Sequence, residues 1–152
     1  MDIGNKLPRL KVTITDGAES EVRLDELEAK FIILFFYPKD HTPGCTIENQ
    51  NFRDAKTKFD MIGAKLFGIS RDPISSHKKF IDKHDLNFPL ISDSDEKLCK
   101  KFDVIKEKNM YGKKVMGIER STFIFDSNKQ LIKVWRKVKV ADHVNEVLAS
   151  IS

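Results

Sequence analysis

The sequence holds little of what marks a secreted or a membrane-bound protein. Its 152 residues include only two cysteines, Cys45 and Cys99, too few for the disulfide framework of a small secreted protein. No apolar run is long enough to span a bilayer, and residues 1–6 lack the apolar core of a signal peptide. We therefore expect a protein of the reducing cytoplasm with no membrane partner.

The net charge is also small, and the sequence shows neither internal repeats nor a metal-binding pattern. The formal net charge is +4 with 33% charged residues, so nucleic acid is not a predicted partner. There is no internal repeat or low-complexity tract, and a hydrophobic content of 40% suffices for one core, so residues 1–152 are predicted to form a single domain. The four histidines show no metal-ligand spacing with Cys45, and no metal site is expected.

One stretch, residues 31–45, organises the rest of the chain. Residues 31–37 form an apolar and aromatic run that predicts a central strand buried on both faces, ended by Pro38. Thr42 and Pro43 then predict the N-cap and first residue of a helix. Cys45 should therefore lie in the first turn of a helix that follows a buried strand.

That position makes Cys45 a candidate nucleophile. Unpaired N–H groups and the positive end of the helix dipole meet at a helix start, and such surroundings lower the pKa of a thiol. The alternative is an inert, buried cysteine that acts as a small hydrophobic residue. The proline-bounded loop favours the nucleophile, because a cysteine that only fills space needs neither that loop nor a helix start.

The order of the predicted elements indicates an α/β fold. A β-α-β unit is followed by an antiparallel strand pair and a final helix, which is the thioredoxin-like order, with an N-terminal β-hairpin added and a central mixed sheet flanked by helices. The predicted strands are 11–15, 21–24, 31–37, 64–70, 88–92, 115–126 and 131–140, with a polar loop at 109–114. The predicted helices are a short connector near residue 24, 43–62, one opened by Asp72 and Pro73 and ending near 84, 95–102 and 141–151.

Two segments carry a resemblance to a known family. Residues 36–46, Phe-Tyr-Pro-Lys-Asp-His-Thr-Pro-Gly-Cys-Thr, resemble the peroxiredoxin active-site pattern Pro-x-x-x-Thr-x-x-Cys, with the bacterioferritin-comigratory-protein or Q-type subfamily the most similar. Residues 117–126 resemble that subfamily's arginine-bearing strand. The likeness extends from Gly4 to the C-terminal helix. It implies a thioredoxin-like antioxidant enzyme without a cofactor, which reduces hydrogen peroxide and organic hydroperoxides.

The resemblance also assigns roles to individual residues. Cys45 would be the thiolate that becomes a sulfenic acid, Thr42 would place its hydroxyl near the peroxide, and Arg120 would stabilise the developing charge. From the residues alone, Thr42 could instead be a plain N-cap and Arg120 an ordinary charge at a strand end. Both readings stay open at this point.

Further residues are expected to line the same site. Pro38 and Pro43 would shield the loop from water, and the backbone N–H groups of Gly44 and Cys45 would bind the peroxide. Glu48 shares the helix face of the cysteine and could orient the arginine, although a solvated glutamate is the simple alternative.

The chain departs from the subfamily where a second cysteine resolves the first. Many relatives carry that cysteine five residues after the peroxidatic one, where this chain has Gln50, and others carry it in the next helix, where Phe80 and Ile81 stand. Cys99 lies on the predicted helix 95–102, and we interpret it as a residue that packs in the core. We therefore expect a monomer with one essential cysteine, re-reduced by thioredoxin or another small thiol.

Two other classes of protein remain as alternatives. A thioredoxin-type disulfide oxidoreductase would need a first cysteine at position 42 and a proline before the later hairpin, but the last proline is Pro89. A non-catalytic thioredoxin-fold binding or chaperone module would contain an inert Cys45, which should react with peroxide no faster than free cysteine.

Overall fold

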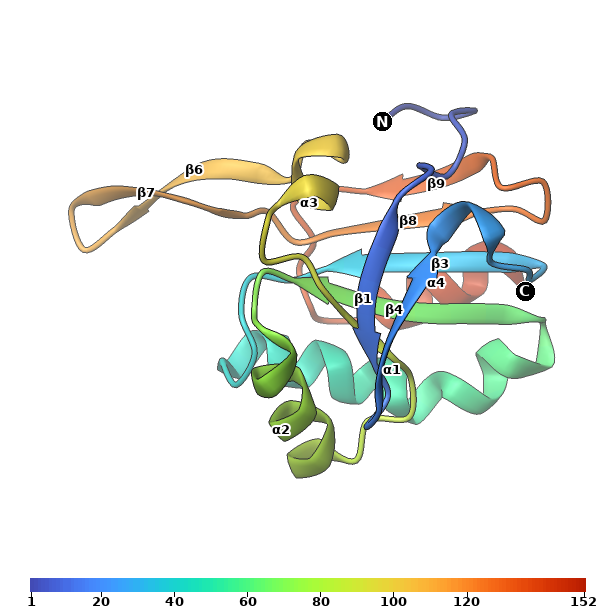
Figure 1. The fold of residues 1–152 in the computed structure, drawn as a ribbon, viewed down its shortest axis with the longest axis horizontal. Helices are drawn as coiled ribbons and strands as arrows, with labels where there is room; N and C mark the ends of the chain where they lie inside the picture. The colour runs from blue at the N-terminus through green and yellow to red at the C-terminus, as the bar shows by residue number, and fades with distance from the viewer.

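A seven-stranded mixed sheet runs through the computed structural model, which describes residues 1–152 (Figure 1). The strand order is β2-β1-β5-β4-β3-β8-β9, and β6 and β7 form a separate two-stranded sheet. The strands are β1 (Lys11–Thr15), β2 (Glu19–Arg23), β3 (Phe31–Phe36), β4 (Ala64–Ser70), β5 (Leu90–Ser92), β6 (Ile105–Met110), β7 (Lys113–Ile118), β8 (Ser121–Phe125) and β9 (Leu131–Trp135). The helices are η1 (Leu24–Glu26), α1 (Pro43–Met61), α2 (Ile74–His84), α3 (Lys97–Lys101) and α4 (His143–Ile151). The predicted thioredoxin-like α/β fold with an N-terminal hairpin is confirmed.

Strand β3 lies inside the sheet, parallel to β4 and antiparallel to β8. Alternate side chains of the strand point into two different cores, as the period of a strand requires. Leu34 and Phe36 belong to one core, and Ile33, Phe35 and the following Tyr37 belong to the other. Burial on both faces explains why the run carries no polar residue.

Helices cover the two faces of the sheet unequally. One core receives the apolar sides of α1, α2 and α4 and contains Cys45 and Phe52. The opposite core is closed by η1, α3 and the N-terminal segment and contains Cys99 and Phe102. The two cysteines are therefore free thiols on opposite faces of the sheet. None of the helices is both long and apolar enough to cross a membrane.

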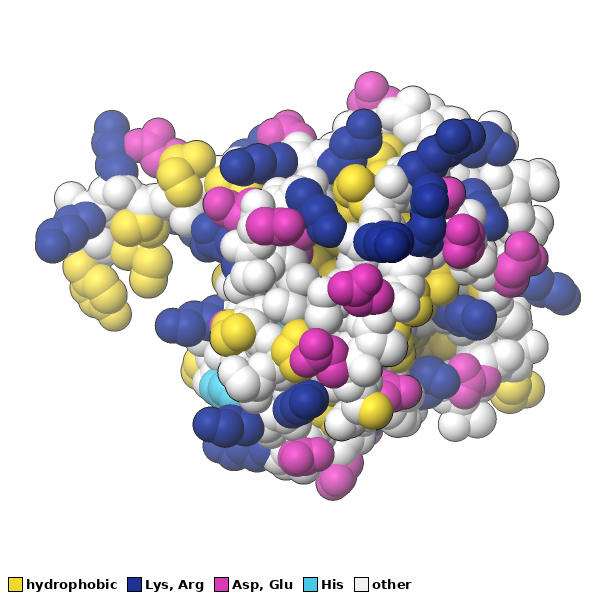
Figure 2. Space-filling view, in the orientation of Figure 1, with side chains coloured by type: hydrophobic (Ala, Val, Ile, Leu, Met, Phe, Trp, Pro, Cys, Tyr) yellow, Lys and Arg dark blue, Asp and Glu magenta, His cyan; other side chains and the backbone are white.

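The prediction of a polar loop at 109–114 is wrong, because β6 and β7 form a hairpin there (Figure 1). Tyr111 and Gly112 have φ of 53° and 79°, which are the left-handed conformations of a two-residue hairpin turn. The hairpin projects from the body of the molecule, and Figure 2 shows hydrophobic and basic side chains together on it. Met110, Tyr111 and Met116 are its most exposed apolar residues.

Several predicted bounds also differ from the structure, and α3 and α4 each begin two residues later than predicted. Residues 115–126 divide between β7 and β8, and β9 ends at Trp135 instead of 140. The chain turns after β9 because Lys137 has a φ of 51° and the N–H of Val138 donates to the carbonyl of Arg120. Helix α2 begins at Ile74 with Pro73 as N-cap, one residue later than predicted.

Candidate active site

Cys45 lies at the start of α1, where the sequence places it. Thr42 is the N-cap, with extended backbone, and Pro43 is the first helical residue. The Cys45 side chain is 1% exposed. The Thr42 hydroxyl donates to the carbonyl of Lys39 at 2.7 Å and makes no capping bond. The cap is therefore confirmed by position, and the expected contact of this hydroxyl with peroxide stays a prediction.

Arg120 reaches Cys45 because of the strand register. Phe36, the last residue of β3, pairs with Ser121, the first residue of β8, so the residue before Ser121 stands beside the loop that follows β3. Arg120 Nη2 lies 3.5 Å from Cys45 Sγ. A Cβ on Gly44 would lie 3.3 Å from the same nitrogen, so a glycine there leaves room for the guanidinium.

Glu48 completes the group, as its helical spacing predicts. Its Oε1 accepts a hydrogen bond from Arg120 Nη1 at 2.7 Å, so the carboxyl is neither solvated nor exposed. Burial raises the pKa of Glu48 to about 7 even though Arg120 opposes the shift, and Oε2 has no hydrogen-bond partner. A proton on Oε2 near neutral pH leaves Oε1 free to orient the arginine.

The guanidinium of Arg120 keeps its charge in these surroundings. Burial acts to lower the pKa of Arg120, but Glu48 and Cys45 outweigh it and raise the pKa. Nearby, burial and then Arg120 lower the pKa of His143 to about 4, so this histidine is neutral at pH 7. Its Nε2 lies 2.8 Å from the hydroxyl of Thr122. Arg120 is thus the permanent cation beside the thiol.

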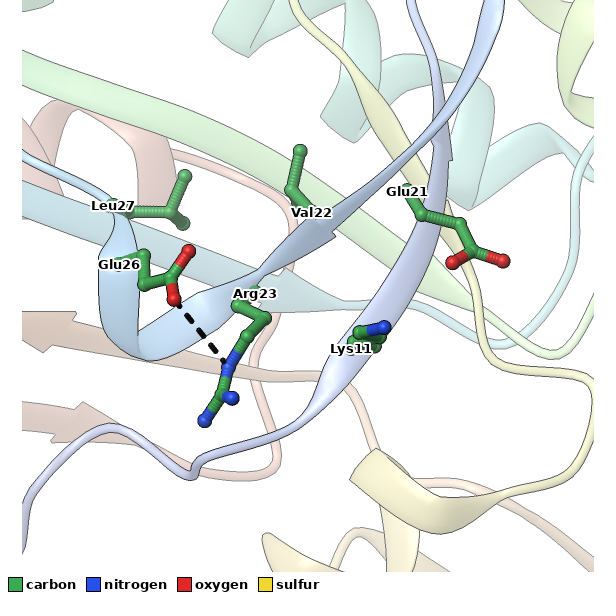
Figure 3. Close-up of a pocket in the computed structure, with 6 residues that line it drawn as sticks. All are labelled: Lys11, Glu21, Val22, Arg23, Glu26 and Leu27. Atoms are coloured by element: carbon green, nitrogen blue, oxygen red, sulfur yellow. Dashed lines mark ion pairs between the residues drawn. The ribbon is translucent and has the colours of Figure 1, made fainter.

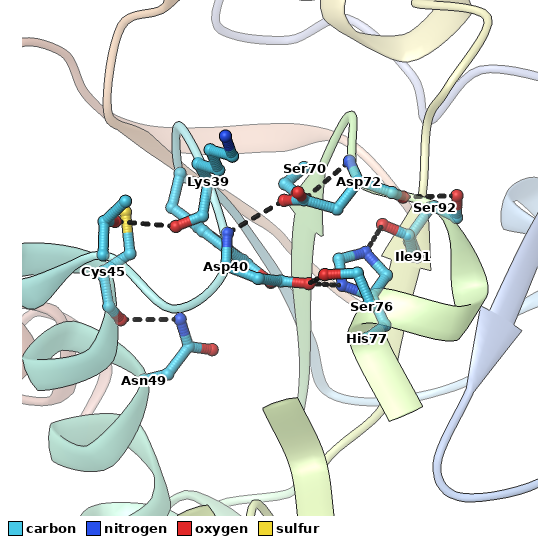
Figure 4. Close-up of polar contacts among 12 residues, drawn as sticks. Lys39, Asp40, Cys45, Asn49, Ser70, Asp72, Ser76, His77, Ile91 and Ser92 are labelled. Atoms are coloured by element: carbon cyan, nitrogen blue, oxygen red, sulfur yellow. Dashed lines mark hydrogen bonds and ion pairs between the residues drawn. The ribbon is translucent and has the colours of Figure 1, made fainter. Parts of the chain in front are cut away.

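Sequence reasoning missed several polar residues that hold this region. The side-chain amide of Asn49 donates to the carbonyl of Cys45 at 2.9 Å, and the signal was its position four residues later on the same helix. Asp40, in the loop before α1, is 3% exposed and is bound to His77 of α2 (Figure 4). No local pattern marked that pair, because 37 residues separate its members.

Two hollows in the surface differ in how they relate to this site. One of about 480 Å³ lies between β1, β2 and η1, and contains an Arg23–Glu26 ion pair but no nucleophile (Figure 3). The other, of about 410 Å³, adjoins the loop after β3 and is lined by Pro38, Lys39 and Arg71 among others. Only the second touches the segment that leads to the thiol.

Known proteins are similar to this chain in sequence and in fold. Residues 3–134 match the AhpC/TSA family. Peroxiredoxin Bcp of Xanthomonas campestris is 49% identical over 93% of this chain and 88% of its own, and Peroxiredoxin Bcp of Bacillus subtilis is 47% identical over 99% and 95%. A solved structure of the X. campestris bacterioferritin comigratory protein, which gives insights into that protein's alkyl peroxide reduction activity, has a TM-score of 0.90 at 45% identity and covers 99% of this chain and 97% of the other. A mutant of PrxQ from Xylella fastidiosa has a TM-score of 0.92 at 41% identity, over 99% and 94%.

A thiol at a helix start, beside a half-buried arginine at the end of a mixed sheet, defines a thioredoxin-like thiol enzyme. The chain belongs to the AhpC/TSA family and is a thiol-dependent peroxidase of the peroxiredoxin type. It acts on peroxide and needs a thiol reductant. Of the alternatives left by the sequence, the non-catalytic module and the disulfide oxidoreductase are both set aside by this membership.

Proposed function

We propose that Cys45 is the peroxidatic residue and that Arg120, held by Glu48, stabilises its reaction. The observation that carries the proposal is the 3.5 Å approach of Arg120 Nη2 to Cys45 Sγ at the N-terminal end of α1. A permanent cation and the positive end of a helix dipole both favour negative charge on sulfur and on the oxygen that departs.

The reaction transfers one oxygen atom to sulfur. The Cys45 thiolate attacks the terminal hydroxyl oxygen of a hydroperoxide, so that an S–O bond forms while the O–O bond breaks. The departing alkoxide, or hydroxide from hydrogen peroxide, takes up a proton and leaves as alcohol or water. Cys45 is oxidised to the sulfenic acid and the peroxide is reduced, which we propose for both hydrogen peroxide and organic hydroperoxides.

The residues around the thiol would hold the peroxide for this attack. The Thr42 hydroxyl donates its proton to the Lys39 carbonyl, so the Thr42 oxygen can accept a hydrogen bond from the O–H of the peroxide. The N–H groups of Gly44 and Cys45 lie in the first turn of α1 and would donate to the departing oxygen. Pro38 and Pro43 would limit the entry of water.

Substitutions test these roles directly. Cys45→Ser should abolish peroxide consumption. Arg120→Ala should slow oxidation of the cysteine about 10²–10³-fold, as removal of one transition-state donor does elsewhere. Arg136→Ala is the matched control, because that arginine lies over the Phe123 ring and donates to Phe102 and Asp103. A wild-type oxidation rate in folded Arg120→Ala would remove Arg120 from the proposed mechanism.

We further propose that the enzyme works with one essential cysteine. Cys45 and Cys99 lie in cores on opposite faces of the sheet, and burial together with Asp93 raises the pKa of the Cys99 thiol well above its ordinary value. Gln50, at the place of a close resolving cysteine, instead contacts His84 Nδ1 at 3.3 Å. A thiol of thioredoxin or of a small molecule would then attack the sulfenic acid and release water. A second thiol would displace Cys45 from the mixed disulfide.

Two measurements test the one-cysteine cycle. Cys99→Ser should keep its turnover with a thioredoxin system, and wild type treated with one equivalent of peroxide should gain one oxygen atom without an internal disulfide. A Cys45–Cys99 disulfide in wild type, with turnover lost in the variant, would refute this cycle.

We also propose that the protein is a monomer with a single domain. It would work in the cytoplasm, in antioxidant defence. The free thiols of Cys45 and Cys99 support a reducing compartment. Sedimentation velocity of the reduced and oxidised protein would test the monomer.

A further inference from the structure

The loop between β3 and α1 is held by a buried carboxylate. Asp40 accepts hydrogen bonds from the hydroxyl of Tyr37 at 2.6 Å and from that of Ser76 at 2.7 Å. Its backbone N–H donates to Asp72 Oδ2 at 2.9 Å, and Figure 4 shows Asp40 joined to Asp72, which follows β4, and to Ser76 and His77 of α2. Asp40 is 3% exposed, so its charge is separated from bulk water.

His77 is the buried partner of that carboxylate. Its side chain is wholly buried on α2, with Nδ1 2.7 Å from Asp40 Oδ2 and Nε2 3.0 Å from the carbonyl oxygen of Ile91 (Figure 4). A carbonyl oxygen can only accept, and the Asp40 carboxylate already accepts from two hydroxyls, so both ring nitrogens face acceptors. Both hydrogen bonds can form together only if each nitrogen carries a proton, which makes the ring an imidazolium.

The surroundings of the ring agree with an ion pair. The titratable groups packed about His77 are Asp40, Tyr37 and, through the Asp40 backbone, Asp72. Burial acts to raise the pKa of Asp40, but hydrogen bonding to His77 and the two hydroxyls outweighs it and lowers the pKa. Asp40 is therefore ionised opposite a ring that donates from both sides.

The pair acts on the reactive segment without touching the thiol. The carbonyl of Lys39, next to Asp40, accepts the Thr42 hydroxyl bond at 2.7 Å, so a shift of Asp40 would carry Thr42 with it. His41, between them, has a φ of 64°, a left-handed conformation that is uncommon for a non-glycine residue. The turn is anchored by the contacts of Asp40 with α2 and with Asp72.

We propose that His77 is a positioning residue: as a buried imidazolium it holds Asp40, and through Asp40 the loop that places Thr42 and Cys45 for reaction with peroxide. This inference rests on the proposed role of Cys45 as peroxidatic residue. Helix α2 would then contribute to the reaction with peroxide. Neither the packing of α2 nor its separation from Cys45 in the sequence indicates such a role.

Oxidation kinetics of three variants test the proposal. The second-order rate constant of Cys45 oxidation by hydrogen peroxide is measured with folding verified for each protein. His77→Leu should be at least about tenfold slower, because small misplacements of reacting groups cost up to about 10²-fold. His77→Asn keeps a donor toward Asp40 but is too short to reach Ile91, and its rate should fall between those of wild type and His77→Leu. Ile81→Ala, the control, removes buried packing from the same helix without contacting Asp40, and should stay within about twofold.

Nitrogen NMR of wild type with labelled histidine gives a second readout, the protonation state of the His77 ring. Two protonated ring nitrogens in His77 at neutral pH support the proposal, and one unprotonated nitrogen overturns it. A folded His77→Leu with the wild-type rate, or an Ile81→Ala that loses as much, also overturns it. If the leucine variant does not fold, His77→Asn decides, and a wild-type rate in that variant is the refuting result.

The reference protein separates this inference from the function on which it rests. If wild type shows no peroxide reaction that Cys45→Ser abolishes, the proposed peroxidatic role fails and the inference fails with it. If wild type reacts and the His77 variants react equally fast, only the positioning role fails.

Discussion

Replacing Glu48 by glutamine should remove a pH dependence of stability that the buried carboxyl creates. Glu48 is 0% exposed and Oε2 lacks a partner, and burial raises the pKa from 4.5 to about 7 against the opposing effect of Arg120. The folded state therefore binds the proton more tightly than the unfolded state. Glu48 contributes most to stability below pH 4.5, and this contribution is lost as the pH rises through about 7.

The size of the effect follows from the two pKa values. The difference between 4.5 and about 7 corresponds to about 3 kcal/mol of unfolding free energy at roughly 1.36 kcal/mol per pKa unit. Glutamine has nearly the same shape, and its side-chain oxygen can still accept the bond from Arg120 Nη1, but it does not titrate. Relative to Glu48→Gln, wild type should lose about 3 kcal/mol of stability between pH 4.5 and a pH above 7.

Urea unfolding, followed by the fluorescence of the single tryptophan, Trp135, measures this difference at each pH. Titrations that the two proteins share cancel when the free energies are subtracted. Glu146→Gln, on the exposed side of α4, controls for the loss of one negative charge. A difference between wild type and Glu48→Gln that is flat from pH 4.5 to above 7, or that grows in favour of wild type, would refute the reasoning.

Two further predictions concern the core. His143 should give a pH dependence of stability opposite to that of Glu48. Its folded pKa of about 4 lies below the ordinary 6.5, so the stability it contributes is present above pH 6.5 and is lost as the pH falls through about 4. Relative to His143→Gln, wild type should lose about 3 kcal/mol across that window in the same urea assay, and a flat difference would contradict the burial argument. Gly68→Ala should cost about 1–3 kcal/mol by overpacking, because the new Cβ would lie 2.7 Å from Leu90 Cδ2 and 2.9 Å from Phe35 Cζ. Unchanged stability in thermal unfolding would show that those side chains have room to move.

The central part of the fold could be predicted because its signals are local. An apolar run marks β3, Pro38 marks the end of the strand, and the Thr-Pro pair marks the start of α1. Those signals are enough to place Cys45 in a first helical turn. The contact with Arg120 is different, since it depends on the register of two strands far apart in sequence, and only the family resemblance pointed to it.

A hairpin with weak local signals and a side-chain pair that depends on distant contacts both escaped prediction. The β6–β7 hairpin turns at Tyr111 and Gly112, a pair that lacks the usual Asn-Gly signal, and its strands alternate poorly because both faces are largely exposed. Asp40 reads in sequence as an ordinary loop carboxylate and His77 as one more inward residue of a helix. Their pairing becomes visible only when α2 is packed against the loop.

The electrostatics of the site join the stability prediction to the proposed reaction. Arg120 faces two acids at once, Glu48 Oε1 at 2.7 Å and Cys45 Sγ at 3.5 Å, and one cation cannot neutralise two anions. Because burial keeps Glu48 protonated up to about pH 7, the carboxyl can hold the guanidinium in place without neutralising its positive charge. In the proposed reaction, the charge then remains for the thiolate and for the oxygen that leaves when the O–O bond of the peroxide breaks. Above neutral pH, the ionised Glu48 lowers the stability of the fold. Below neutral pH, by this reasoning, the protonated Glu48 directs Arg120 toward the sulfur of Cys45.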